Sequence, residues 1–463
     1  MPGSNPSFRR PGRGRRGDHE KGIEALKYRR RTAPKPVQDE TDLLARRERA
    51  VLVGVVFPGQ ARADVEDHLE ELARLTETAG GAVMARHVQE RRRADPAYFI
   101  GRGKAEEIAG LVREHRADVV IFDDDLTPAQ VRNLGEALGA RVVDRSGLIL
   151  DIFARRARSR EAKTQVELAR LNYLLPRLRG GWTHLSRQEG GIGVRGGIGE
   201  TQIELDRRII RRRIHRLEHE LARIEGERRR RRTGRLGTVK VAIIGYTNAG
   251  KTTLFNALTR ENAFVEDRLF ATLDPLVRRV RLKIGKDVLF IDTVGFIRKL
   301  PHHLVASFRS TLEEAVEADV LIHVVDLSHP DYEEQMEVTR QVVISLGMEE
   351  RPVITVFNKI DRVEDPTVAE RARRLHPEAL FVSATKAHGV REVVERTEEV
   401  LHREIVERDV RLASTDLDGI SRVYALAEVI RIIHHDGCVD IRFRTSRARA
   451  RALFASVEVR EAG

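Results

Sequence analysis

The chain has 463 residues, more than the roughly 100 to 200 of a typical domain, so we expect two to four domains. Its 41% hydrophobic, 33% charged and 5% aromatic residues indicate a solvated protein with mostly aliphatic cores. The net charge of +12 favours a polyanionic partner, unless it reflects coding bias alone.

Two absences in the sequence narrow the setting. Cys438 is the single cysteine, so an internal disulfide is excluded and a reducing compartment is expected. No apolar run reaches the roughly 18 residues of a membrane helix, and the N-terminus lacks the apolar segment of a secretory signal. We therefore expect a cytoplasmic protein that is a monomer in solution and is not stably inserted in a membrane.

The first 150 residues are predicted to contain two sections. Residues 1–45 combine many arginines with Pro and Gly, which predicts a disordered basic tail; a transit peptide fits less well because Asp18 and Glu20 interrupt the basic pattern. Residues 46–150 alternate β-branched runs with helical stretches, which predicts a small parallel sheet covered by helices. Strands are expected at 51–57, 119–122 and 142–144, and helices at 104–114 and 128–138.

Residues 151–233 are predicted to form a helical hairpin with a glycine-rich tip loop at 180–199. Apolar residues recur at alternating spacings of four and three in both helices, the pattern of a heptad seam. Pro176 should end the first helix early. The seam residues are Thr164, Leu168, Leu171, Leu175 and Leu178 in the first helix and Ile210, Ile214, Leu217, Leu221 and Ile224 in the second.

Two more domains are predicted in the second half of the chain. Residues 234–405 have the pattern of an α/β domain. Residues 406–463 alternate apolar and polar residues around an Asp436-Gly437 turn, which predicts a hairpin in a small α+β domain. The strands expected in the α/β domain are 239–244, 288–292, 320–326, 353–358 and 379–382.

The first of these strands leads into Gly245-Tyr-Thr-Asn-Ala-Gly250-Lys251-Thr252, which has the spacing of a phosphate-binding loop between a strand and a helix. Its glycines allow backbone amides to surround phosphate oxygens at a helix N-terminus. We expect Lys251 to reach the β- and γ-phosphates and Thr252 to bind Mg²⁺.

Three further motifs follow in the order of a guanine-nucleotide site. Asp292-Thr-Val-Gly295 ends a strand, so Asp292 can hold the metal through water and the Gly295 amide can contact the γ-phosphate. In Asn358-Lys359-Ile-Asp361, the last carboxylate can accept two hydrogen bonds from guanine that adenine cannot donate. Ser383-Ala384-Thr385 would complete the base pocket. The chain is therefore predicted to be a GTP-hydrolysing switch protein.

Three residues refine the predicted mechanism. Thr272 is the candidate switch residue, which would close over Mg²⁺ and the γ-phosphate. Phe296 follows Gly295 where many signalling GTPases have a water-orienting Gln, so slow intrinsic hydrolysis is expected. Asn248 resembles a residue of potassium-activated GTPases whose side-chain oxygen helps to hold K⁺, but it could instead be a turn-forming residue.

The candidate site residues fall into three groups around GTP. The catalytic residues are Lys251, Thr272 and Gly295, and the metal ligands are Thr252, Thr272 and Asp292. The GTP-binding residues are Gly245, Tyr246, Thr247, Asn248, Ala249, Gly250, Lys251, Thr252, Thr253, Phe270, Ala271, Thr272, Asp292, Thr293, Val294, Gly295, Asn358, Lys359, Asp361, Ser383, Ala384 and Thr385.

The tip loop at 180–199 is the candidate RNA contact. It combines flexibility, stacking rings and positive charge, which suits irregular RNA, although it could be an ordinary mobile loop. Its Gly191-Ile-Gly193-Val-Arg-Gly196 string matches a dinucleotide fingerprint, but no strand precedes it, so that interpretation is rejected. The candidate RNA-binding residues are Trp182, His184, Arg187 and Arg195.

Several long stretches resemble the HflX family of ribosome-associated GTPases. In the nucleotide-binding region these are 245–259, 270–275 and 292–297, and in the first half they are 98–104, 163–169 and 190–204. The resemblance covers about 50–405, and 410–463 loosely. Gly197-Ile198 stands where the family usually has a single Pro, and Thr252 replaces the commoner Ser.

The resemblance implies both a fold and a function. The fold is a P-loop GTPase domain of α/β class, preceded by a small α/β domain with a long helical hairpin and followed by a small α+β domain. The function is that of a GTPase that binds the large ribosomal subunit and its rRNA and splits stalled or idle ribosomes under stress. The alternatives are a ribosome-assembly or RNA-binding GTPase that does not split ribosomes, and a signalling switch at a membrane surface or protein partner.

Overall fold

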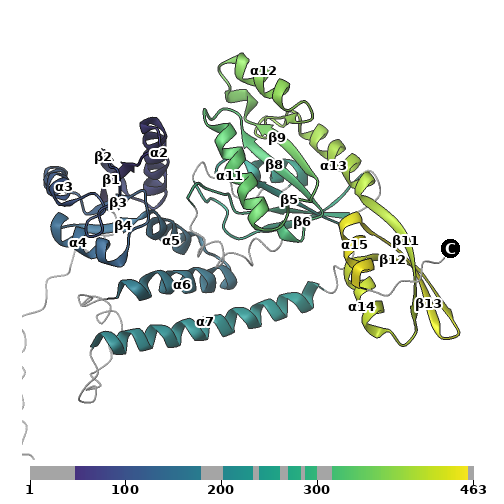
Figure 1. The fold of residues 1–463 in the computed structure, drawn as a ribbon. Coiled ribbons are helices and arrows are strands. Elements are labelled where there is room, and N and C mark those ends of the chain that lie inside the picture. The colour runs from purple at the N-terminus through teal and green to yellow at the C-terminus, as the bar shows by residue number, and fades with distance from the viewer. Residues whose placement is uncertain are drawn as a thin grey trace, which may run out of the picture. The chain divides into compact units, whose positions relative to one another are not determined.

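The computed structural model describes residues 47–178, 202–232, 239–260, 269–282, 287–299 and 315–456. The predicted basic tail at 1–45 and the predicted tip loop at 180–199 lie outside these residues. The same is true of the candidate RNA-binding residues Trp182, His184, Arg187 and Arg195. The described residues from Glu48 onward belong to one unit and contain three separate sheets (Figure 1).

The first sheet is parallel, with the strand order β2-β1-β3-β4. Its strands are β1 (Arg49–Val56), β2 (Ala82–Glu90), β3 (Val119–Phe122) and β4 (Arg141–Asp144), and its connecting helices are α2 (Arg62–Thr78), α3 (Arg102–His115) and α4 (Pro128–Leu138). The expected strands β1, β3 and β4 and helices α3 and α4 are confirmed. The pattern missed β2 because this edge strand is only partly buried and mixes apolar with polar residues.

Helix α4 shows why local signals predicted part of this domain. Thr127 precedes the helix and accepts a hydrogen bond from the Gln130 amide, Pro128 occupies the first turn, and Gly139 ends the helix with a φ of 64°. These are the usual start and stop signals of a helix. Helix α2 has Ala61 at its start and no side-chain cap hydrogen bond, so its beginning carried no such signal.

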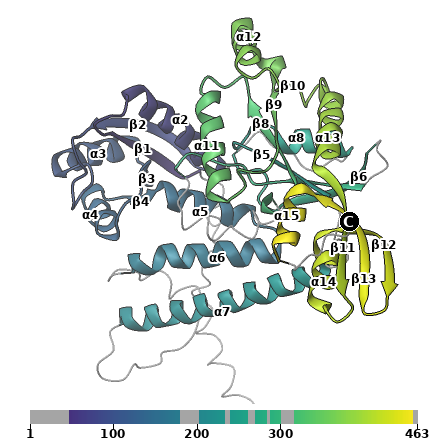
Figure 2. The ribbon, with the colours of Figure 1, turned by 45° about the vertical axis from the view of Figure 1, so that its right-hand side comes forward.

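The predicted helical hairpin is present in the described residues. Helix α5 (Arg145–Arg156) leads into α6 (Arg160–Leu174), and α7 (Gln202–Arg232) returns beside α6 (Figures 1 and 2). Arg160 pairs with Glu220, and Glu167 pairs with Arg213. The earlier residue of α6 therefore pairs with the later residue of α7, so the two helices are antiparallel.

The structure shows where α6 ends and that it has a second buried face. Helix α6 gives way to a short 3₁₀ turn (Leu175–Arg177), which confirms that Pro176 ends it. The heptad pattern did not predict that α6 buries a second face, made of Ala162, Val166 and Ala169, against the core that includes α5.

None of the helices described, α7 included, is long and apolar enough to cross a membrane.

The second sheet has the strand order β10-β9-β8-β5-β7-β6, parallel except for β6. Alternate residues of β5 face opposite sides: Val241 and Ile243 pack with α8 and α13, whereas Ala242 and Ile244 pack with α11. The expected strands are confirmed, and β6 was not predicted. The elements are β5 (Val239–Gly245), α8 (Lys251–Thr259), β6 (Leu276–Arg281), β7 (Asp287–Asp292), β8 (Val320–Asp326), α11 (Tyr332–Ser345), β9 (Val353–Asn358), α12 (Pro366–Leu375), β10 (Leu380–Phe381) and α13 (Val390–Glu404).

The third sheet is antiparallel, with the order β11-β13-β12, and helices α14 and α15 accompany it (Figure 2). The predicted hairpin is confirmed: β12 and β13 are joined at Asp436-Gly437, where Gly437 has a φ of 79°. Strand β11 was not predicted. The elements are β11 (Ile405–Ala413), α14 (Leu417–Leu426), β12 (Glu428–His435), β13 (Cys438–Ser446) and α15 (Arg447–Ser456).

One hydrophobic core joins the first sheet domain to the domain of the second sheet. Phe153 of α5 packs edge-on against Phe270, with ring centroids 4.7 Å apart, and both rings are about 2% exposed. Leu273 and Val294 belong to the same core. The loops around the phosphate-binding motif are therefore packed directly on the preceding domain.

This core generates a stability prediction. Replacing Phe153 with Ala is expected to lower the free energy of unfolding by about 3–5 kcal/mol, because it leaves a cavity beside Phe270. The measurement is urea unfolding followed by circular dichroism. Leu417→Ala is the control, since Leu417 is 74% exposed and its loss should change stability by less than about 0.5 kcal/mol. Equal effects of the two substitutions would contradict the importance of this core.

Candidate nucleotide-binding site

The phosphate-binding motif lies between the end of β5 and the start of α8. Gly245 and Gly250 have φ values of 147° and 90°, a region that favours glycine. A Cβ atom at Gly245 would lie 2.2 Å from the Val324 carbonyl oxygen, and one at Gly250 would lie 2.2 Å from Asn358 Nδ2. Both glycines are thus required by close approach of neighbouring strands as well as by backbone conformation.

Lys251 is buried at the start of α8, and its Nζ donates to the Tyr246 carbonyl oxygen at 2.7 Å. Burial lowers the pKa of its ammonium group to about 8, and the nearby Asp292 carboxylate partly opposes this. A polyanion bound in the loop would favour the charged form further. Binding a phosphate should therefore stabilise the charged form of Lys251 more than that of an exposed lysine.

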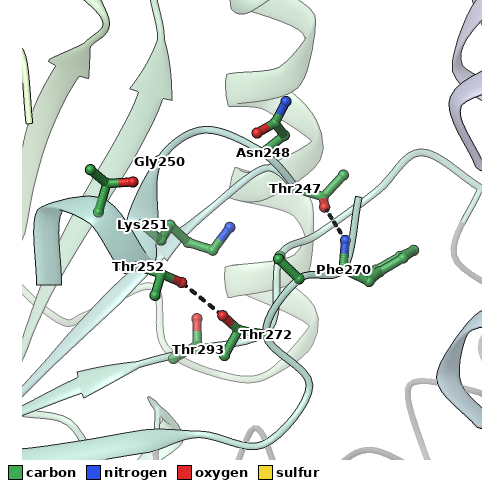
Figure 3. Close-up of a pocket in the computed structure, with 11 residues that line it drawn as sticks. Thr247, Asn248, Gly250, Lys251, Thr252, Phe270, Thr272 and Thr293 are labelled. Atoms are coloured by element: carbon green, nitrogen blue, oxygen red, sulfur yellow. Dashed lines mark hydrogen bonds between the residues drawn. The ribbon is translucent and has the colours of Figure 1, made fainter. Parts of the chain in front are cut away.

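Three oxygen-bearing side chains meet beside Lys251. The Thr252 hydroxyl donates to Asp292 Oδ2 at 2.6 Å and lies 2.7 Å from the Thr272 hydroxyl, which faces it in Figure 3. Asp292 Oδ1 is buried and has no hydrogen-bond partner among the described residues. Burial raises the pKa of Asp292 to about 6. Hydroxyl and carboxylate oxygens are the ligands preferred by hard cations, so this set fits Mg²⁺.

The segment after Asp292 is bound to the phosphate loop through its backbone. Phe296 N donates to the Gly245 carbonyl oxygen at 3.1 Å, and Thr247 N donates to the Phe296 carbonyl oxygen at 2.7 Å. A Cβ atom at Gly295 would lie 2.5 Å from Thr247 Cα, so only glycine fits there. The Phe296 side chain is 2% exposed and packs in the core with Ala242 and Ile244, away from solvent.

The candidate switch segment is held from two sides. Phe270 N donates to the Thr247 hydroxyl at 2.9 Å, as Figure 3 shows, while the Phe270 ring contacts Phe153. Phe270 has a positive φ of 55°, which is uncommon for a residue with a side chain. The turn directs the following residues toward Thr252, which is how Thr272 reaches the oxygen cluster.

The candidate base-binding residues are linked to the loop by Asn358. Its Nδ2 donates to the Ala249 carbonyl oxygen at 2.9 Å, and its Oδ1 accepts from the Ala384 amide at 3.0 Å. The Asn358 side chain therefore fixes the distance between the phosphate loop and the Ser383–Thr385 loop.

Lys359 and Asp361 follow Asn358 in the same sequence motif. A hydrogen bond from the Ser383 side chain is the largest cause that lowers the pKa of Asp361, so this carboxylate is kept ionised as an acceptor. Lys359 pairs with Asp326 at 2.7 Å. Sequence reasoning assigned no role to Asp326, although its position at the end of an apolar strand was a usable signal.

The structure collects much of the predicted site in one cavity. Eleven residues line it (Figure 3), and all are among the predicted GTP-binding residues: Thr247, Asn248, Gly250, Lys251, Thr252, Thr253, Phe270, Ala271, Thr272, Thr293 and Gly295. Val294 instead packs in the core shared with α5. The predicted base-binding residues do not line this cavity, and Asn358 connects them to it.

A second cavity also borders the phosphate loop. Asn248 lines both cavities, and in the second it is joined by Glu71 and Arg74 of α2, by Arg298 and by His329. Sequence reasoning missed this cavity because it did not predict α2. Asn248 has a φ of 63°, which suits the turn-forming role that was its alternative interpretation.

The raised pKa of Asp292 has a measurable consequence. The folded protein holds this proton more tightly than the unfolded chain does, so its stability falls as the pH rises from about 4 to about 6. The Asp292→Asn variant has no carboxyl group that titrates at this position, so it does not show this loss of stability. Without nucleotide or divalent cations, the variant should exceed the wild type in free energy of unfolding by up to about 3 kcal/mol at pH 7.5 and by about half as much at pH 5. Urea titrations at both pH values test this; an Asn variant no more stable at pH 7.5 would contradict it.

Three family models match consecutive parts of the chain. Residues 66–154 match the model described as GTP-binding GTPase N-terminal. Residues 156–235 match GTP-binding GTPase Middle Region, and residues 240–359 match 50S ribosome-binding GTPase.

Sequence similarity to known relatives extends over most of the chain. GTPase HflX of Magnetococcus marinus is 45% identical over 387 residues, which cover 83% of this chain and 89% of the relative. GTPase HflX of Escherichia coli (strain K12) is 42% identical over 402 residues, which cover 86% and 93%. A solved GTP-binding protein of Sulfolobus solfataricus in complex with GDP is 24% identical, covers 77% of this chain and 99% of its own, and has a TM-score of 0.41. From its relatives and family models, this chain belongs to the HflX family of GTPases and hydrolyses GTP.

Proposed function

We propose that this GTPase binds the large ribosomal subunit and dissociates stalled or idle ribosomes under stress. The observation that carries the proposal is the direct packing of the switch segment on the preceding domain, through Phe270 and Phe153. A γ-phosphate that orders Thr272 would thereby act on the half of the molecule that carries the helical hairpin. The match of residues 240–359 to a family described as 50S ribosome-binding supports the ribosome as the partner.

The proposed nucleotide site uses Mg²⁺ as its cofactor. Thr252, Thr272 and Asp292 would hold the ion, and the ion would neutralise charge that develops on the phosphates during transfer. Lys251 would stabilise the β- and γ-phosphates, and the Gly295 amide would contact the γ-phosphate. Lys251, Gly295 and Thr272 are thus the three proposed catalytic residues.

Among the described residues, position 296 is the one where many signalling GTPases have a water-orienting side chain. The Phe296 ring is buried in an apolar core and offers no hydrogen bond, so it cannot orient the attacking water. We infer that contact with the ribosome supplies what Phe296 lacks. GTP would then be hydrolysed slowly in free solution and rapidly on the large subunit, in the cytoplasm where ribosomes work.

The hairpin is the proposed rRNA contact. The described part of α7 exposes several arginines, including Arg208, Arg212 and Arg216. Lys and Arg bind nucleic-acid backbones by displacing counterions, so binding should weaken as salt rises. The tip-loop residues proposed for base stacking lie outside the described residues.

The function is tested by sedimentation of purified ribosomes. With GTP or a nonhydrolysable analogue, the protein should raise the fraction of free subunits, and isolated large subunits should stimulate GTP hydrolysis. Binding without new free subunits would favour the alternative, an assembly or RNA-binding GTPase that does not split ribosomes. Binding to acidic vesicles in place of ribosomes would favour a signalling switch at a membrane.

Deletion of residues 180–199 separates the two activities. The shortened protein should bind and hydrolyse GTP as before, because the deleted segment contributes no residue to the proposed nucleotide site. It should no longer dissociate ribosomes in the sedimentation assay. Dissociation that survives the deletion would exclude the tip loop as the active contact.

Asp361 is predicted to set base specificity. Asp361→Asn should weaken GTP binding at least about 100-fold, because an amide cannot accept both guanine donors. It should bind xanthosine triphosphate instead, whose ring carries a carbonyl where guanine has the amine. Fluorescent-nucleotide titration measures both. Asp365→Asn is the matched control: Asp365 caps α12 by accepting from Thr367 N, and its change should leave GTP affinity unaltered.

A second cation, K⁺, is proposed at Asn248. Hydrolysis should then be faster in potassium than in sodium salts, and Asn248→Gly should remove the difference while tolerating the positive φ. Turnover measured in both salts tests this. If the residue only forms a turn, wild type and variant will each hydrolyse GTP equally in the two salts.

A further inference from the structure

The Tyr246 hydroxyl is a hydrogen-bonding centre that the proposed nucleotide chemistry does not use. Tyr246 lies in the phosphate loop, but its side chain points out of the loop and is only 4% exposed. Its hydroxyl donates to the Glu71 carboxylate of α2 and accepts from the Arg298 backbone amide at 2.9 Å. One side chain thus joins the phosphate loop, the segment after Gly295 and the N-terminal sheet domain.

A network of buried charges holds the Glu71 end of this contact. Arg145 is 2% exposed and pairs with Glu71 and, at 2.6 Å, with Asp123. Asp123 also accepts from Lys299 Nζ at 2.5 Å, and Lys299 directly follows the residue whose amide binds Tyr246. Buried charges of this kind are tolerated only when every partner is present. The network therefore contacts the segment after Gly295 twice, at the Arg298 amide and at the Lys299 side chain.

The same segment bears on the phosphate loop at its other end. Phe296 is hydrogen-bonded to Gly245 and Thr247 through its backbone, and a Cβ atom added at Gly295 would clash with Thr247. Arg298 is three residues from Gly295, so the Tyr246 hydroxyl helps to hold the far end of a segment whose near end lies over the phosphate site. The ion pairs of Arg298 with Asp331 and of Lys299 with Asp123 hold the same end, so losing the hydroxyl would loosen this end without releasing it.

We propose that Tyr246 and Glu71 are positioning residues for GTP hydrolysis, which hold Gly295 where its amide can contact the γ-phosphate. Hydrolysis would then depend on contact between the nucleotide domain and the N-terminal sheet domain. The inference rests on the proposed contact of Gly295 with the γ-phosphate and is independent of ribosome splitting. A purely stabilising role for the hydroxyl would act on GDP and GTP complexes alike.

Tyr246→Phe tests this because it removes one oxygen atom. The kcat of GTP hydrolysis and the affinity for a nonhydrolysable GTP analogue should each fall roughly tenfold, the worth of one hydrogen bond to a charged group. The affinity for GDP should stay within about twofold, because GDP lacks the γ-phosphate. Equal losses for GDP and the analogue, or an unchanged kcat, would overturn the proposal.

Tyr173→Phe is the matched control. The Tyr173 hydroxyl is also partly buried and donates to a carboxylate, Asp144 Oδ1, at 2.7 Å, but it lies within the N-terminal domain. Its removal should leave kcat and both affinities unaltered. A decrease in kcat equal to that of Tyr246→Phe would mean that any lost hydroxyl slows the enzyme, which would overturn the proposal.

Glu71→Gln and a double variant test whether the two residues act together. If Glu71 acts through Tyr246, adding Glu71→Gln to Tyr246→Phe should lower kcat by less than the product of the single effects. Independent, multiplicative effects would overturn the coupling. Glu71→Gln also serves if Tyr246→Phe folds poorly, since it leaves the tyrosine in place; thermal unfolding of each variant checks this.

Gly295→Ala separates failure of this inference from failure of the proposed γ-phosphate contact. It should abolish binding of the GTP analogue, because the added Cβ would meet Thr247 at 2.5 Å. If Gly295→Ala loses the analogue but keeps GDP, while Tyr246→Phe keeps both, the γ-phosphate contact stands and the role of Tyr246 is excluded. If Gly295→Ala keeps the analogue, the contact itself is wrong.

Discussion

The backbone bonds between the phosphate loop and Phe296 are the constraint on which the site depends. They place the segment after Asp292 directly over the loop, so that Gly295 must lack a side chain. They also turn the Phe296 ring into the core rather than toward the site. One local pairing therefore explains both the required glycine at 295 and the burial of the Phe296 ring.

Burial of Lys251 and Asp292 makes this site favourable for binding ions of opposite charge. Burial lowers the pKa of Lys251 to about 8 and raises that of Asp292 to about 6, so each charged form is disfavoured by its surroundings. A polyphosphate and a divalent cation would supply charges of the opposite sign. Binding energy is thus available at the γ-phosphate end, where Thr272 and Gly295 are proposed to respond.

Two contacts connect the segments proposed to respond to the γ-phosphate with the preceding domain. The Phe153–Phe270 pair supports the switch segment by apolar packing, and the Tyr246–Glu71 hydrogen bond supports the segment after Gly295 by a buried polar contact. Apolar packing is tolerant of small shifts, whereas a buried charge network is not. The second contact is therefore the one that we propose responds to the position of the γ-phosphate.

The fold class, most strands and the order of the nucleotide motifs could be predicted from the sequence, because apolar runs, glycine spacing and helix caps are local signals. The partly buried strand β2 and helix α2 could not, because their patterns are weak. The contact of Glu71 with Tyr246, 175 residues away, became visible in the folded chain alone, since no local pattern records a contact between distant segments. The tertiary structure also brought eleven of the predicted nucleotide-binding residues into one cavity, because parallel strands end at the same edge of a sheet.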